Sequence, residues 1–294
     1  MLEVTYRMFM GCVIPNRLPF IEASSRKALT KLGLELEDLP GATCCPDPVG
    51  GQSMDHLSWL AIGARNLAIA EDLGCDLVSP CNGCVETLKS VNYFVGEDEH
   101  EHEKINELLA LVNKSYSGRT KVKHLIELLH DDFGLEKVRE AVTKPLDGLK
   151  VACHYGCHYS RPSSVVRGED PFHPEKLDNL VAALGATPVE YDEKALCCGN
   201  ATSKTEDEPA IAVGLAKFES IAASGADCIA VICPACFLQL DTYQAIVNRK
   251  YQTEFKIPVL YYTELLALAL GVDPDSIGLN FHRVKPGKVL ELLK

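Results

Sequence analysis

The sequence has little of what marks nucleic-acid-binding, secreted or membrane-spanning proteins. It contains 29 lysines and arginines against 41 aspartates and glutamates, and this net charge of −12 argues against nucleic acid or an anionic membrane as the main partner. No stretch reaches the roughly 20 uninterrupted apolar residues that a membrane-spanning helix needs. Glu3 and Arg7 interrupt the N-terminal apolar stretch, so we expect no signal peptide and a cytoplasmic protein.

Two redox signatures are also absent. No Gly-x-Gly-x-x-Gly follows a predicted strand, and the Cys-x-x-Cys-x-x-Cys-x-x-x-Cys-Pro run of a ferredoxin module is missing. Cysteine itself is abundant, with 13 residues. Because the number is odd and no export signal is present, metal or redox chemistry is favoured over a disulfide framework. With 294 residues, 47% apolar and 24% charged, the composition is globular and the length suggests two domains.

Ten of the cysteines form two matching series. Both series consist of a single cysteine, an adjacent pair and a Cys-x-x-Cys dyad: Cys12, Cys44, Cys45, Cys81 and Cys84, then Cys157, Cys197, Cys198, Cys233 and Cys236. The flanking Met10-Gly11-Cys12 matches Tyr155-Gly156-Cys157. The repeat indicates an internal duplication, with domains at 1–142 and 149–294. The stretch 143–148, punctuated by Pro and Gly, is the predicted linker.

Short apolar runs alternate with amphipathic stretches in both halves. This alternation predicts an α/β fold in which each half is a small, mostly parallel sheet flanked by helices, the halves being related by pseudo-twofold symmetry. The cysteines then fall at the carboxyl ends of strands, the usual place for a site. Predicted strands are 3–10, 34–39, 75–80, 120–124, 149–155, 187–191, 228–232 and 257–261. Predicted helices are 19–33, 55–73, 83–93, 101–113, 124–134, 174–185, 207–224, 235–248 and 262–270.

The cysteine pattern favours an iron–sulfur cluster in each half. Each half supplies five thiols, whereas a structural zinc ion is satisfied by four ligands. Adjacent side chains diverge in extended chain, so an adjacent pair suits two irons of a larger cluster better than one ion. Soft thiolates at this density select iron–sulfur or zinc. A zinc-stabilised, non-catalytic scaffold and a dithiol exchange protein stay as alternatives.

These motifs resemble the double CCG-domain iron–sulfur family that includes the B subunit of heterodisulfide reductase, and the resemblance covers almost the whole chain. Two departures are Pro46, which follows the first cysteine pair where the motif has Gly, and the additional Cys153. The resemblance implies that each five-cysteine set binds a noncubane [4Fe-4S] cluster and that the two clusters face one cavity. There the mixed disulfide of coenzyme M and coenzyme B, a substrate of methanogenesis, would be reduced to two thiols.

The resemblance also implies partners, because electrons must reach this chain from elsewhere. In that family they come through a small ferredoxin-like subunit and a flavin-containing subunit of the same complex, linked to a hydrogenase or a formate dehydrogenase. Other enzymes of the CCG group are the alternative reading. They serve thiol-driven fumarate reduction or the oxidation of lactate or glycolate.

Four further residues are candidate site residues. His154 and His158 flank Cys157 and are possible proton donors, with a hydrogen bond to a cluster sulfur or to the backbone as the alternative. Arg17 and Arg161 follow the first cysteine of each half and are candidate anchors for an anionic substrate. An ion pair or carbonyl contact within the loop is the alternative for both arginines.

The remaining features have simple structural expectations. Cys75, Cys153 and Cys228 lack counterparts in the repeat and are expected to be buried core residues. The acidic run 97–103 is expected to be a solvated face, and the basic tail 282–288 is expected to lie on the surface.

Overall fold

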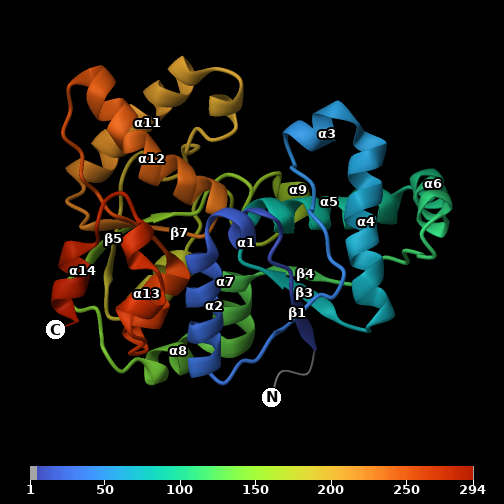
Figure 1. The fold of residues 1–294 in the computed structure, drawn as a ribbon, viewed down its shortest axis with the longest axis horizontal. Coiled ribbons are helices and arrows are strands. Elements are labelled where there is room, and N and C mark those ends of the chain that lie inside the picture. The colour runs from blue at the N-terminus through green and yellow to red at the C-terminus, as the bar shows by residue number, and fades with distance from the viewer. Residues whose placement is uncertain (1–4, 294) are drawn as a thin grey trace.

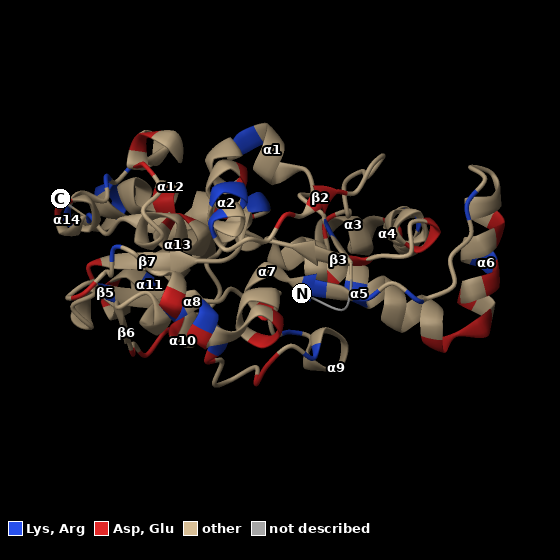
Figure 2. Cartoon of the chain, turned by 90° about the horizontal axis from the view of Figure 1, so that it is seen from below, with Lys and Arg blue, Asp and Glu red and all other residues tan. Residues whose placement is uncertain are grey.

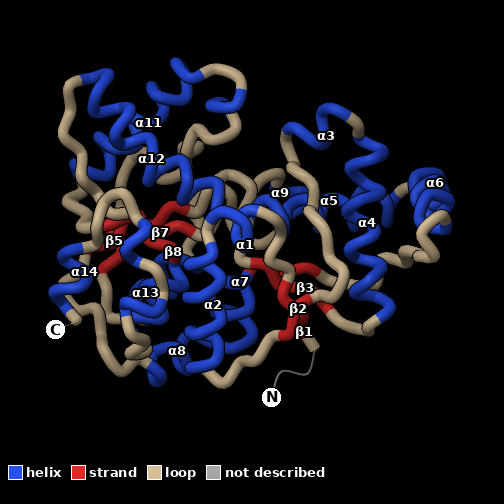
Figure 3. Tube along the Cα trace, viewed as in Figure 1, coloured by secondary structure: helices blue, strands red, loops and turns tan. Residues whose placement is uncertain are grey.

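The computed structural model describes residues 5–293 and contains one four-stranded sheet in each half. Every strand pair in this part of the chain is parallel, as predicted. Figure 3 shows the two sheets separated by helices. The first has the order β2 (Glu37–Asp38), β1 (Tyr6–Met8), β3 (Asp76–Ser79), β4 (Val122–His124); the second has β6 (Thr187–Val189), β5 (Lys150–His154), β7 (Cys228–Val231), β8 (Val259–Tyr261).

The predicted helices occur in the expected order, but the short helices at 13–17, 50–54, 135–141, 163–166 and 287–292 were not predicted. Those of the first half are α1 (Val13–Arg17), α2 (Pro19–Lys31), α3 (Gly50–Met54), α4 (His56–Asp72), α5 (Asn82–Glu97), α6 (Glu99–Ala110), α7 (Leu125–Glu127) and α8 (Leu135–Ala141). Those of the second half are α9 (Ser163–Val166), α10 (Lys176–Ala183), α11 (Asp207–Ala223), α12 (Pro234–Tyr251), α13 (Tyr262–Ala269) and α14 (Gly287–Leu292).

Local chemistry explains several helix ends. Pro19 opens α2, where its missing N–H costs nothing, and the Asp55 side chain accepts the backbone N–H of Ser58 to cap α4. The single helix predicted over 124–134 is wrong in detail. Residue 124 ends β4, α7 is short, and the π-helical segment Leu128–Gly134 follows it. Gly134, at φ +99°, separates this segment from α8.

A central layer of helices joins the two halves. Helix α2 packs against α13 of the other half, and α10 packs against α7 and α8 in the same reciprocal manner. Figure 1 shows α2 beside α13 between the sheets. The residues of this layer and both sheets form one continuous apolar core, which includes Val78 and Leu128 from the first half and Val151 and Leu265 from the second. The reciprocal packing gives the fold its pseudo-twofold symmetry.

Each sheet has its own outer cover. Helices α4 and α5 pack together over the first sheet, and α11 and α12 pack together over the second. The acidic start of α6 lies at the edge of the molecule, as Figure 2 shows. Among residues 5–293, no helix combines the length and the apolar character that crossing a membrane requires.

The linker and the tail are more buried than the sequence suggests. In the linker, Leu146 is fully buried, and the backbone N–H groups of Thr143 and Lys144 both donate to the carbonyl of Ala269 at 2.9 Å. The surface expectation for the tail is wrong at His282, which is buried and has its Nε2 2.8 Å from Glu264 Oε1. A buried carboxylate needs such a partner, and this need draws the tail inward.

Candidate metal centre

All ten cysteines of the two series line one cavity between the halves. The cavity has about 880 Å³ of empty space, open solvent at its mouth included, and its lining includes Pro48 and Val49 before α3 and Lys204 of the 3₁₀ turn Thr202–Lys204. Its floor is formed where strands end and helices begin, because α5 follows Cys81 and α12 follows Cys233 directly. The predicted convergence at the carboxyl ends of parallel strands therefore describes where the thiols lie.

The ten thiols form a continuous series in which each cysteine influences the pKa of a neighbour. In the first half the order is Cys12, Cys44, Cys45, Cys84 and Cys81, and the Sγ atoms of Cys12 and Cys44 are 3.4 Å apart. Cys81 is linked in the same way to Cys233 of the other half. From there the order reverses, through Cys236, Cys198 and Cys197 to Cys157. The site is thus symmetric about the Cys81–Cys233 pair.

The thiols shift one another's pKa in opposite directions. A hydrogen bond from Cys157, followed by one from Cys198, lowers the pKa of Cys197 to about 2. The hydrogen bond to Cys45 raises the pKa of Cys44 well above its usual range. In both halves a cysteine with a lowered pKa therefore lies next to cysteines with raised pKa values. Packing further thiolates this closely requires a cationic centre to offset their repulsion.

Two glycines allow the first cysteine of each half to approach its dyad. Gly11 and Gly156 have φ values of +66° and +75°, a region that favours glycine. A Cβ at Gly11 would lie 2.6 Å from Cys84 Sγ, and one at Gly156 would lie 3.0 Å from Cys236 Sγ. The glycine before each first cysteine therefore serves the assembly of the site.

Each half also holds the dyad of the other half. The Tyr261 hydroxyl donates to the carbonyl of Pro80, the residue before Cys81. In the reciprocal position, His124 Nε2 donates to the carbonyl of Ile232, the residue before Cys233, at 3.1 Å. Both tethering side chains come from the last residue of an edge strand, β4 or β8.

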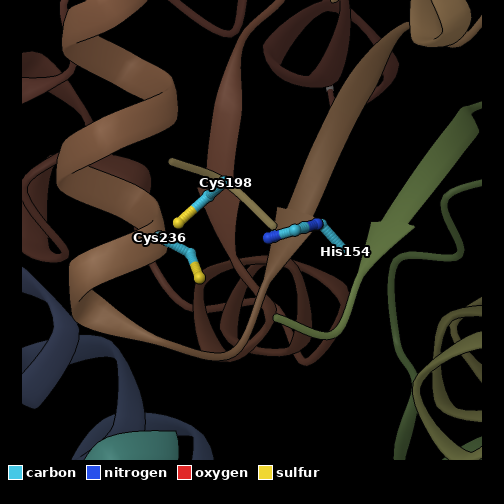
Figure 4. A group of neighbouring side chains, drawn as sticks. All are labelled: His154, Cys198 and Cys236. Atoms are coloured by element: carbon cyan, nitrogen blue, oxygen red, sulfur yellow. The ribbon is translucent and has the colours of Figure 1, made fainter. Parts of the chain in front are cut away.

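The donor set fits a polynuclear centre in each half better than a single ion. Each half brings five thiols to the cavity, one more than tetrahedral zinc uses. In the second half, a ring nitrogen of the buried His154 and the sulfurs of Cys198 and Cys236 all lie within 4.8 Å of one another (Figure 4). Thiolates at this density are the ligands of iron–sulfur clusters.

The other predicted site residues lie at different depths. His158 lines the cavity, whereas His154 is buried behind the thiols. Arg161 lines a neighbouring cavity and donates to the carbonyls of Ala195 and Pro171, at 3.4 and 3.1 Å. Arg17 is exposed at the end of α1. Cys75, Cys153 and Cys228 are buried core residues, as predicted.

Three charged groups near the thiols were not predicted. Lys204 lines the cavity and pairs across its mouth with Asp47 of the other half, at 3.2 Å. Lys217 of α11 is fully buried. The helical register could have revealed Lys217, because it falls in the same apolar stripe as Gly214 and Ile221. No comparable signal marks Lys204.

The chain matches one family of known proteins along most of its length. The family description "CCG: Cysteine-rich domain" matches twice, at residues 6–89 and 151–241. The B subunit of a ferredoxin:CoB-CoM heterodisulfide reductase from Methanosarcina mazei is 40% identical over 281 residues, which cover 95% of this chain and 93% of that protein. The chain belongs to the CCG family. Its resemblance to the double-domain proteins that include the heterodisulfide reductase B subunit is thereby confirmed.

Other matches show the breadth of the CCG family. A protein from Wolinella succinogenes, named 8-methylmenaquinol:fumarate reductase membrane anchor subunit, is 31% identical over 98% of this chain and 100% of its own length. The crystal structure of a hypothetical protein from Helicobacter pylori, 16% identical, has a TM-score of 0.75 over 96% of this chain and 52% of that one, and shows the fold alone. The relatives from Methanosarcina and Wolinella are named as reductase subunits, so this is an oxidoreductase family.

Proposed function

We propose that this chain is the catalytic subunit of a heterodisulfide reductase and reduces the coenzyme M–coenzyme B disulfide to two thiols. The convergence of ten thiols on one cavity between duplicated halves carries the proposal. The names of relatives at 38–40% identity over most of the chain support it. The chain would receive electrons from a ferredoxin-like and a flavin-containing subunit in the cytoplasm, fed by a hydrogenase or formate dehydrogenase.

The cysteines would hold two [4Fe-4S] clusters, of the noncubane type expected from the resemblance. The first-half set would hold one cluster and the second-half set the other. Cleavage of one disulfide takes two electrons and two protons and yields two thiols. When bound, the two clusters would supply the electrons singly, one beside each sulfur of the substrate.

Side chains at the cavity would donate protons and bind the charged groups of the substrate. His158 lines the cavity, and its Nδ1 lies 3.9 Å from Glu86 Oε2. Because imidazole exchanges protons near neutral pH, His158 would protonate a product thiolate. Lys204 would bind an anionic group of the substrate, and the outer Arg161 and Arg17 remain proposed anchors. His154, buried and away from the cavity lining, is the weaker proton donor of the two histidines.

Anaerobic purification, iron and sulfide analysis, and an assay with reduced viologen test the proposal. We expect a brown protein with two clusters that cleaves the coenzyme M–coenzyme B disulfide. Cys198→Ser should alter the spectrum of one cluster and abolish turnover in a folded protein, whereas Cys228→Ser, a buried cysteine outside both series, should keep both. A colourless zinc protein would contradict the proposal.

A second candidate function rests on the full-length match to the Wolinella protein. In that case the chain would pass electrons between a quinol or thiol donor and a fumarate-reducing partner. A brown protein that leaves the coenzyme M–coenzyme B disulfide intact, but exchanges electrons with a quinol, would favour this candidate.

A further inference from the structure

The two halves are not chemically alike behind their thiols. Helices α4 and α11 both have 17 residues. When α4 is shifted by 151 residues, every buried position of α11 falls on a buried position of α4, so that Leu60 corresponds to Ile211 and Gly63 to Gly214. Both of these glycines face a valine of the next helix, at 2.6 and 3.3 Å from the position a Cβ would take. By this correspondence, the buried Asn66 of the first half is replaced by Lys217 in the second.

The matching strands differ in the same way. Strands β1 and β5 occupy equivalent places in their sheets, and their registers against β3 and β7 pair Met8 with Val78 and Cys153 with Ala230. The next residue of the chain is Phe9, directly after β1, in the first half and His154, the last residue of β5, in the second. The first half therefore has a neutral pair, Phe9 and Asn66, where the second half has an imidazole and an ammonium group.

Lys217 has no carboxylate partner among residues 5–293. Its side chain is fully buried, and its Nζ donates to the carbonyl of Glu193 at 2.5 Å. The Nζ also lies 3.4 Å from His154 Nδ1 and 5.5 Å from the centre of the Tyr191 ring. A buried cation needs compensating negative charge, and the neighbouring Cys198 and Cys236 would supply it as thiolate ligands of a cluster.

The ammonium group also fixes the proton on His154. An ammonium only donates, so His154 Nδ1 accepts and Nε2 carries the proton. This Nε2 atom is buried and has no hydrogen-bond partner in the described part of the chain. Figure 4 shows the ring directed toward the sulfurs of Cys198 and Cys236. The N–H group is therefore positioned to donate to sulfur in the second half.

We propose that Lys217 and His154 raise the reduction potential of the second-half iron–sulfur centre above that of the first, so that a single electron resides there first. The inference rests on the proposed function for the presence of two such centres. Positive charge and N–H···S hydrogen bonds stabilise the more negative, reduced form of a cluster. Asn66 cannot do the same, because its amide is occupied by the Thr43 N–H and the Cys44 carbonyl. Lys217 and His154 are thus positioning residues for electron transfer.

An anaerobic redox titration of the whole protein, followed by absorption and electron paramagnetic resonance, tests this inference. Lys217→Met removes the charge at nearly constant length. We expect it to shift the reduction equilibrium of one centre at least tenfold toward the oxidised form, which is about 59 mV for one electron. The centre affected should be the one whose signal Cys198→Ser alters. Lys217→Arg keeps the positive charge and should return the reduction potential most of the way to that of the parent protein. If Lys217 had only a structural role, the potential would not depend on the charge in this way.

Two further variants keep the test decisive. Lys194→Met removes a lysine of the same half whose charge is already paired with Asp178 and Glu190, at 2.8 and 2.9 Å, and should leave both centres unchanged. His154→Phe introduces the residue of the first half and should lower the reduction potential of the same centre. It becomes the deciding variant if Lys217→Met does not fold. If the reduction potentials of both centres stay the same in these variants, or shift equally, the inference is overturned and the proposed function is left intact. A protein without iron would overturn both.

Discussion

At the scale of single residues, glycine decides whether the thiols can meet. Gly156→Ala would place a Cβ 2.8 Å from Asn82 Nδ2 and 3.0 Å from Cys236 Sγ, and would strain a positive φ. We expect reduced iron content in the second half and a lower melting temperature. Gly225→Ala is the matched control, because Gly225 has φ +70° with nothing within 4 Å of a Cβ. It should cost only about 1–2 kcal/mol of backbone strain, with full iron content. Equal iron loss in both variants would contradict the role of close approach.

Glu86 gives a pH-dependent prediction. Burial raises the pKa of this carboxyl to about 7, while the unfolded chain loses the proton near 4.5. Between these two pH values the folded state binds more protons than the unfolded state. The contribution of Glu86 to the free energy of unfolding therefore falls as pH rises, and the destabilisation is complete above about pH 7.

Glu86→Gln should therefore stabilise the protein increasingly as pH rises from 5.5 to 8.5, by up to the order of 3 kcal/mol. Melting temperatures measured anaerobically at several pH values check this. Glu219→Gln, on the exposed side of α11, should show no such trend. A constant difference between Glu86→Gln and the parent at all pH values would contradict the account.

At the scale of elements, the tether from β8 to the opposite dyad is testable. Tyr261→Phe leaves the buried Pro80 carbonyl without its donor, which costs about 1–3 kcal/mol. We expect a lower melting temperature and an altered spectrum of the first-half centre, because Pro80 precedes Cys81. Tyr243→Phe loses only a surface hydrogen bond to Asp207 and should stay within about 0.5 kcal/mol of the parent. An unchanged melting temperature in Tyr261→Phe would count against the tether.

The elements themselves were largely predictable from the sequence. Hydrophobic periodicity and turn residues gave α4, α11 and β7 to within a few residues, because these elements bury strongly patterned faces. The π-helical segment Leu128–Gly134 and the inward-turned His282 were not predictable. Both depend on contacts with distant chain, which local pattern does not contain. The same holds for Lys204, whose place at the cavity depends on the meeting of two loops.

At the scale of the whole molecule, the shared core predicts that neither half folds alone. Helices α2 and α13 cover each other's apolar faces, and α10 does the same for α7 and α8. Residues 1–142 and 149–294, expressed separately, should aggregate because those faces are exposed. Expressed together, they should recover a complex with the iron content of the full chain. Size-exclusion chromatography and circular dichroism check both outcomes, and a monomeric half with a cooperative melt would contradict the prediction.

The reciprocal tethers have a consequence for inheritance. Tyr261 and His124 each complete the binding loop of the opposite copy, so after duplication neither copy kept a finished loop of its own. A mutation that weakens one tether therefore destabilises the cysteine loop of the other copy, and a compensating change would have to occur there. Splitting the gene would leave two products that each lack a necessary part. A single copy would complete the same loop only by pairing with a second copy of itself.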